Sequence, residues 1–314
     1  MSHNTSLGRF STLTLTGAPI RGAITLSRRE TFPSRQYDFS QYDYFNQPDW
    51  KPMEVPTQGR HLCLRLEGCI GRGGSAVVYA AKATSNDPEG CASPIEAELC
   101  VKLAKPHRCR TLAREGWVYE QLAEGTYQGV IVPRCYGFFA ADLPHNQFPV
   151  SPISLEDLLD TFDFDTADLW HDERLCDEEW KITDSTPGGR ELSPWVDWRR
   201  DPSAPLLCVL VMTRGGGPYT LHEDHLDKSN RAEVFEILDD LSADGILHQD
   251  LRPANIIRAP ADAETCPRHN RVHKWNLIDF ALTRVDTPDD SEDKLRFQAV
   301  SMYQKRGYTC RRFA

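Results

Sequence analysis

The sequence has no long apolar run. No stretch approaches the roughly 20 apolar residues that a membrane-spanning helix needs, and the N-terminus lacks the apolar core of a secretory signal. We therefore expect no membrane partner and an intracellular protein, most simply a cytoplasmic one. Residues 1–29 contain four arginines and many Ser and Thr but no acid before Glu30, which is also the composition of a mitochondrial transit peptide, so mitochondrial targeting is the minority alternative.

Positive charge is also in short supply. Lys and Arg number 36 against 46 Asp and Glu, which gives a net charge of -10. A protein of this charge is not expected to bind nucleic acid. The acids are dense in residues 143–205, a polar stretch too long for an ordinary loop, which we interpret as an acidic insertion. Through electrostatic steering, such an insertion favours a basic partner.

Paired cysteines are missing as well. The ten cysteines are scattered, none forms a C-x-x-C pair, and several lie inside apolar runs. This pattern predicts reduced, mostly buried thiols, without a disulfide framework and without a zinc site.

Two stretches of the chain carry residues suited to phosphoryl transfer. In residues 245–257 an apolar pair enters a turn that presents Asp250 and Asn255, and in residues 277–281 a second apolar pair delivers Asp279. In this chemistry one carboxylate orients the attacking hydroxyl, while an Asn and a second Asp hold the metal ions that bridge the phosphates. Asp250 fits the first task, and Asn255 and Asp279 fit the second.

These stretches resemble two motifs of protein kinases. His248-Gln249-Asp250 with Arg252 and Asn255 resembles the catalytic loop H-R-D-L-x-x-x-N, and Asp279-Phe280-Ala281 resembles D-F-G. Over about residues 61–285 the chain resembles a divergent, C-terminally truncated protein kinase-like domain of fungal type. The resemblance implies that the protein uses ATP and Mg²⁺, that Asp250 is the catalytic base, and that Arg252 lies near the γ-phosphate.

A glycine turn upstream fits the same resemblance. Gly71-x-Gly73-Gly74-x-Ala76-x-Val78 resembles the glycine-rich loop G-x-G-x-x-G-x-V, with Ala76 in place of the third glycine. It also satisfies a dinucleotide-binding fingerprint, but that motif requires a helix next, whereas residues 77–79 predict a strand. The loop would cradle the phosphates, with Ile70 and Val78 packing on the adenine.

The remaining cofactor contacts follow from the resemblance. Lys102, in an apolar strand at 98–103, takes the place of the lysine that binds the α- and β-phosphates. Glu115, in a helix predicted at 111–123, is its ion-pair partner, with Glu120 as the alternative. The adenine pocket would comprise residues of the strands and hinge together with one from below, namely Cys100, Met212, Thr213 and Ile257.

The expected fold class is α+β, a two-lobed protein kinase-like fold with a β-rich N-lobe and a shortened helical C-lobe. Residues 1–58 are interpreted as a poorly ordered leader. The domain then spans 59–314, with an N-lobe at about 59–211, a hinge at 212–217 and a C-lobe at 218–314. Helices are predicted at 232–243 and 293–305.

Three functions remain open. The first is an ATP- and Mg²⁺-dependent phosphotransferase acting on a hydroxyl, with a protein serine or threonine favoured as acceptor. The second is a pseudokinase, a nucleotide-binding or scaffolding module, because Ala76 and Ala281 replace glycines and Gln249 replaces an arginine. The third is a small-molecule kinase of the aminoglycoside phosphotransferase type. The acceptor is unknown in each case.

Overall fold

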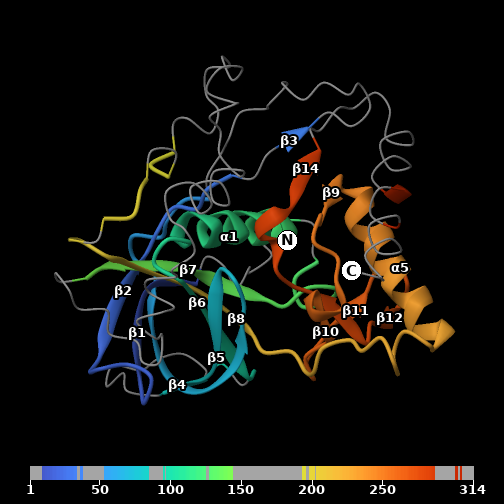
Figure 1. The fold of residues 1–314 in the computed structure, drawn as a ribbon, viewed down its shortest axis with the longest axis horizontal. Coiled ribbons are helices and arrows are strands. Elements are labelled where there is room, and N and C mark those ends of the chain that lie inside the picture. The colour runs from blue at the N-terminus through green and yellow to red at the C-terminus, as the bar shows by residue number, and fades with distance from the viewer. Residues whose placement is uncertain are drawn as a thin grey trace.

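Seven strands form a closed β-barrel (Figure 1). The computed structural model describes residues 9–33, 36–37, 53–84, 95, 97–124, 127–143, 193–195, 198–201, 203–286, 301–302 and 305. Around the barrel the order is β1-β2-β7-β8-β6-β5-β4. The strands are β1 (Phe10–Gly17), β2 (Ile24–Arg28), β4 (Arg60–Arg72), β5 (Ala76–Ala83), β6 (Leu99–Ala104), β7 (Cys135–Asp142) and β8 (Leu206–Thr213).

The N-terminal strands close the barrel. β1 pairs in parallel with β4, while β2 pairs antiparallel with β1 on one side and with β7 on the other. At the end of β1, Gly17 pairs with Leu66 and has a φ of +119°. A Cβ atom at this position would lie 2.3 Å from the Leu66 carbonyl oxygen, so only glycine fits the closure.

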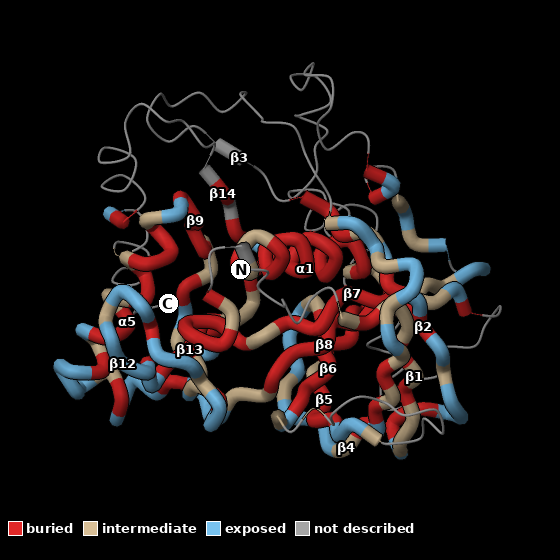
Figure 2. The backbone as a smooth tube through the Cα atoms, turned by 180° about the vertical axis from the view of Figure 1, so that it is seen from behind, coloured by how far each residue is buried: buried red, intermediate tan, exposed pale blue. Residues whose placement is uncertain are grey.

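The strands β6, β7 and β8 are apolar because both of their faces are buried. In β8, alternate residues point into the barrel, and the residues between them face the helix α1 (Cys109–Glu124), which lies across the outside of the barrel. Figure 2 shows this layer of α1, β6, β7 and β8 as largely buried. The inward residues of β8 are Leu207, Val209 and Val211, and the outward ones are Cys208, Leu210 and Met212.

The part of the described chain from residue 218 to 286 packs beside the barrel and α1 and combines the helix α5 with short strands and turns (Figure 1). Its strands form three small sheets, β10-β13, β11-β12 and, together with β3 from earlier in the chain, β3-β14-β9, and the strands β9, β10, β13 and β14 flank in sequence the loops that carry the polar residues. The elements of this part and its sheets are β3 (Gln36–Tyr37), α5 (Lys228–Ala243), β9 (Ile246–Leu247), η3 (Pro253–Asn255), β10 (Ile256–Arg258), β11 (Thr265–Cys266), β12 (Arg271–Val272), β13 (Trp275–Leu277), η4 (Phe280–Leu282) and β14 (Arg284–Asp286).

The predicted two-lobed α+β fold with a shortened helical C-lobe is wrong. A closed seven-stranded barrel takes the place of the β-rich lobe, and α1 and α5 are the two α-helices described along their whole length. The physical reason lies at the N-terminus, where residues 10–28 supply β1 and β2 and complete the barrel. The sequence carried a signal for this, because Leu13 and Leu15 alternate with threonines as in a half-buried strand.

Several predicted elements are confirmed. Residues 77–79 belong to the strand β5, and the strand β6 and the helices α1 and α5 lie where the sequence predicts them, with ends shifted by a few residues. Most of the acidic insertion at 143–205 and most of the predicted helix at 293–305 fall outside the described residues. Within the described part of the chain, no helix combines the length and the apolar character needed to cross a membrane.

We predict that Leu15→Ala destabilises the protein. Leu15 is fully buried inside the barrel, so losing its side chain should lower the free energy of unfolding by about 2–5 kcal/mol. Thr14→Ala, one residue away on the other face of β1, serves as the matched control and should cost less than about 1 kcal/mol. Urea denaturation measures both values. Equal effects of the two substitutions would show that β1 is not part of the core.

Candidate active site

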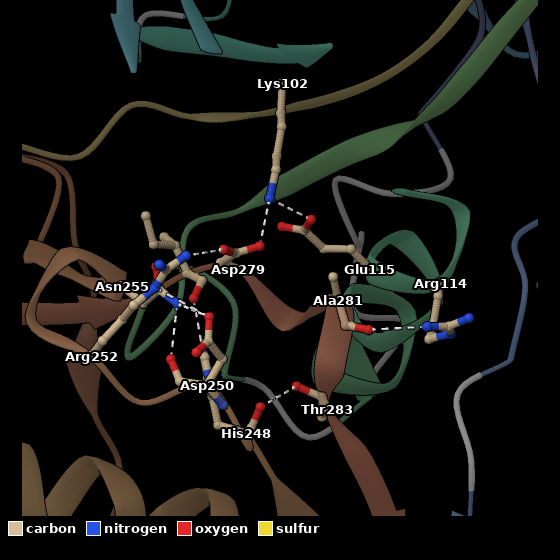
Figure 3. Close-up of polar contacts among 11 residues, drawn as sticks. Lys102, Arg114, Glu115, His248, Asp250, Arg252, Asn255, Asp279, Ala281 and Thr283 are labelled. Carbon is tan, nitrogen blue, oxygen red and sulfur yellow. Dashed lines mark hydrogen bonds and ion pairs between the residues drawn. The ribbon is translucent and has the colours of Figure 1, made fainter. Parts of the chain in front are cut away.

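A buried lysine lies at the centre of the candidate site (Figure 3). Lys102 is an outward-facing residue of β6, and its side chain is only 10% exposed. Its Nζ donates to Glu115 Oε2 of α1 at 2.6 Å and to Asp279 Oδ1 at 2.9 Å. The ammonium group therefore joins the barrel, α1 and the segment before η4. Glu120, the alternative partner, instead accepts a hydrogen bond from Thr31 at 2.7 Å.

The charges of this triad are strongly coupled. Burial disfavours the Lys102 cation, but the carboxylates of Asp279 and Glu115 outweigh that effect and raise the pKa of Lys102. The nearby Lys102 lowers the pKa of Asp279 to about 2, so Asp279 is ionised at neutral pH. Burial raises the pKa of Glu115 to about 7, while Lys102 acts in the opposite direction. Asp279 is thus the permanent anion of the triad.

The loop after β9 brings three more polar side chains to the site. Asn255 Nδ2 donates to the backbone oxygen of Asp250 at 2.9 Å and to its Oδ2 at 3.0 Å. Arg252 lies between two carboxylates, with Nε 3.2 Å from Asp250 Oδ2 and Nη2 3.6 Å from Asp279 Oδ2. The Arg252 side chain is 53% exposed, so this bridge is formed at the surface of the site.

His248 holds this loop against the segment of Asp279. The ring is fully buried, and Nε2 lies 2.9 Å from the carbonyl oxygen of Ile278, while Nδ1 lies 3.3 Å from the backbone N-H of Asp250. A carbonyl only accepts, so we assign the proton to Nε2, which leaves Nδ1 to accept from Asp250. The imidazole therefore links the two loops.

Asp279 is held in an unusual backbone conformation. Its φ of 68° and ψ of 64° are left-handed, which is uncommon for a residue other than glycine. The next residue, Phe280, packs edge-on against Tyr119 of α1 with ring centroids 5.4 Å apart. Arg114, beside Glu115 on α1, donates to the Ala281 carbonyl at 3.4 Å. Packing thus fixes the strained residue, a situation typical of functional sites.

The glycine turn lies beside the triad only in part. Val78 pairs with Lys102 across β5 and β6, so the end of the turn adjoins the lysine, and Gly73 N-H donates to the Ala76 carbonyl at 2.9 Å. Ile70, predicted to pack on adenine, is instead 45% exposed. Gly71 pairs with Val78, and Gly74 has no heavy atom near its missing Cβ, so the tip of the hairpin is open.

Backbone N-H groups of the predicted hinge already donate hydrogen bonds within the protein. Thr213 N-H donates to the Arg134 carbonyl at 2.9 Å, and Arg214 N-H donates to the Glu98 carbonyl at 2.7 Å. Gly215 packs so closely on Ile257 that a Cβ would lie 2.4 Å from Ile257 Cδ1. The structure therefore brings the hinge and Ile257 together.

Two buried residues from the predicted adenine pocket lie next to the hinge. Met212 and Cys100 are paired neighbours in β8 and β6, and both are buried. Burial raises the pKa of the Cys100 thiol to about 12, so this side chain is an apolar wall. A separate cavity of about 450 Å³, which includes Arg28, Trp195 and Trp198 in its lining, contains none of the predicted site residues.

Sequence reasoning missed the residues that position the site. Arg114 holds the segment of Asp279, and Thr31 donates to Glu120, yet no local pattern marks these contacts because each joins distant segments. Phe280 belongs to the predicted motif of Asp279, but its packing on Tyr119 joins distant segments in the same way. The chain matches no known family model, and a search of curated proteins likewise finds no match.

We predict that Asp279→Asn changes the acid stability of the protein. The folded pKa of Asp279 is about 2, below the ordinary 3.8, so its charge stabilises the fold above about pH 4, and this contribution is lost as the pH falls toward 2. The stability difference between wild type and variant should shrink by about 2 kcal/mol over this window. Urea denaturation from pH 5 downward measures it, with the more exposed Asp262→Asn as control. A pH-independent difference would contradict the assignment.

Proposed function

We propose that the protein is an ATP- and Mg²⁺-dependent phosphotransferase that moves the γ-phosphate to a hydroxyl, with a protein serine or threonine as the first acceptor to test. One observation carries the proposal. Six polar side chains from four separate parts of the chain converge through contacts of 2.6 to 3.6 Å. They include two cations, a carboxylate suited to act as a base and two oxygen ligands, which are the parts that phosphoryl transfer requires. The six are Lys102, Glu115, Asp250, Arg252, Asn255 and Asp279.

Two of these side chains fit a magnesium ion. Asn255 directs Nδ2 toward Asp250, so its amide oxygen is left as the ligand atom, and Asp279 remains an anion because its pKa is about 2. Mg²⁺ prefers oxygen ligands and is usually held by one or two carboxylates together with substrate phosphates. When bound, it would neutralise charge that develops on the transferred phosphate.

Lys102 is suited to bind the α- and β-phosphates. The two carboxylates keep its ammonium group charged despite burial, and Glu115, from α1, holds it in place. Asp279 accepts one hydrogen bond from the Lys102 ammonium group, at 2.9 Å. A phosphate oxygen that replaced this contact would keep the lysine paired and would release an Asp279 oxygen for the metal.

Asp250 is suited to orient the acceptor hydroxyl and to take its proton. Asn255 and Arg252 both contact Oδ2, which fixes the rotation of the carboxylate. Arg252 lies on the exposed side, between Asp250 and Asp279, where the γ-phosphate would have to lie for transfer. A guanidinium there would stabilise the charge on the transferring group.

A second candidate is nucleotide binding without transfer. Arg252 bridges Asp250 and Asp279, and Lys102 donates to Asp279. Both carboxylates are therefore already paired with cations of the protein itself. Ala76 and Ala281 also replace glycines of the resembled motifs. The two candidates differ in whether bound ATP is consumed.

We predict that Asp250→Asn lowers phosphate transfer by about 10²- to 10⁴-fold, the range typical of losing a general base. ATP should still bind, because Asp250 is not placed on the nucleotide. Transfer from labelled ATP to protein and small-molecule hydroxyl acceptors measures the rate, and Asp262→Asn is the matched control at the surface. Unchanged transfer by Asp250→Asn would exclude this residue as the base.

We predict that ATP with Mg²⁺ stabilises the protein by about 2.7 kcal/mol at 100 times its Kd. The stabilisation should disappear in Lys102→Ala and in Asp279→Ala, and should persist in Lys82→Ala, an exposed lysine of the neighbouring strand β5. Thermal unfolding with and without Mg²⁺ measures it. Stabilisation without transfer to any acceptor would favour the second candidate, and stabilisation that persists in both variants would contradict the proposed site.

A further inference from the structure

A second polar cluster lies outside the candidate active site. Asp240 of α5, Cys266 of β11, and His269 and His273 around β12 each offer one ligand atom, and these atoms all lie within 4.8 Å of one another. Asp240, Cys266 and His273 are buried, and His269 is partly buried. A thiol, two imidazoles and a carboxylate are the ligand types that zinc prefers.

The distances fit a tetrahedral zinc ion. Cys266 Sγ lies 3.4 Å from His269 Nδ1 and 3.6 Å from Asp240 Oδ2, and His269 Nδ1 lies 3.4 Å from the same Asp240 oxygen. Zinc bond lengths of about 2.0 to 2.3 Å place tetrahedral ligand atoms roughly 3.3 to 3.6 Å apart. Three of the four ligand atoms, those of Cys266, His269 and Asp240, are therefore already at the spacing that a tetrahedral zinc ion requires.

His273 provides an independent sign of a ligand. Its ring is 1% exposed, and neither ring nitrogen makes a hydrogen bond with the described residues. An unsatisfied buried group of this kind costs about 1–3 kcal/mol and calls for an explanation. Nδ1 lies 3.8 Å from Glu233 Oε1, so a carboxylate is within reach of the ring. If Nδ1 donates to Glu233, Nε2 is left for the metal, which is the usual arrangement around a zinc-bound histidine.

The surrounding charges are compatible with a cation. Arg268 contacts Asp240 through Oδ1 at 3.2 Å, which leaves Oδ2 facing Cys266 and His269. With Cys266 deprotonated and both imidazoles neutral, the thiolate and Asp240 balance the two charges of Zn²⁺. Binding releases the thiol proton to solvent.

We propose that these four residues form a structural zinc site that fastens the β11-β12 hairpin to α5. The four side chains fill all four positions of a tetrahedral zinc ion, so neither water nor substrate is needed as a ligand. Four protein ligands are typical of structural zinc. The spacing Cys266-x₂-His269-x₃-His273 supplies three ligands, and α5 supplies the fourth. The proposal reverses the sequence-based expectation of no zinc site, and it does not depend on the proposed phosphotransferase activity.

The test uses the full chain, stripped with a chelator and reloaded with Zn²⁺ or Co²⁺ alone. We expect one equivalent of zinc by elemental analysis, a higher Tm with zinc than with chelator, and, with cobalt, tetrahedral ligand-field bands together with a thiolate charge-transfer band. Cys266→Ser should lose the charge-transfer band. A change in a residue that only supports a ligand typically weakens metal affinity by about 10- to 100-fold, and His273→Ala should weaken zinc affinity by more than that. Glu233→Gln should weaken it within that range.

The controls carry the same residue types away from the cluster. Cys69→Ser and His222→Ala change an exposed cysteine and an exposed histidine, and both should bind metal as the wild type does. If Cys266→Ser does not fold, Asp240→Asn and the cobalt spectrum of the wild type decide the question. Binding of less than about a tenth of an equivalent of zinc, an octahedral cobalt spectrum, or a charge-transfer band unchanged in a folded Cys266→Ser variant would overturn the proposal.

Discussion

The ion triad of Lys102, Glu115 and Asp279 is the interaction on which the arrangement of the site depends. A buried ammonium is tolerated only when carboxylates compensate for its lost hydration, and here the two carboxylates come from different parts of the chain. β6, α1 and the segment before η4 must therefore meet at one place. Removing one member would leave an uncompensated buried charge, so the site and the junction of these elements are coupled.

Helix α1 links the ion triad to other parts of the protein. Besides Glu115, its buried Arg114 binds the Ala281 carbonyl and its buried Glu120 binds Thr31. Gly116 allows the close approach, since a Cβ there would lie 3.2 Å from Thr31 and 3.3 Å from Phe138. One helix thus contacts the N-terminal segment, the barrel and the loop of Asp279. The N-terminal segment is consequently part of the support of the site.

Sequence reasoning located the polar residues better than it located the fold. Asp250, Asn255 and Asp279 belong to short motifs, and Lys102 stands out as a cation within an apolar strand, so local patterns marked these residues, and the resemblance to protein kinases implied that they would meet. Barrel closure depends on pairing between residues about 50 positions apart, which periodicity alone does not encode. The contacts of Arg114 likewise join separate segments, so no spacing rule for a single stretch reveals them. In the cluster around Cys266 three residues lie in one short stretch, but the fourth, Asp240, comes from α5, so the set of four could not be read from one stretch alone.

The pairing of β1 with β4 and of β2 with β7 has a consequence for synthesis of the chain. Residues 10–28 leave the ribosome before the strands that pair with this hairpin, and β7, the second partner of β2, begins only at Cys135, more than 100 residues later. At 5–20 residues per second, the edge of β2 stays open for roughly 5 to 20 s, whereas the edge of β1 can pair earlier with β4. Edges of this kind pair readily with other chains. Until β7 has been made, the free edge of β2 is therefore a place where the unfinished barrel is open to pairing with other chains.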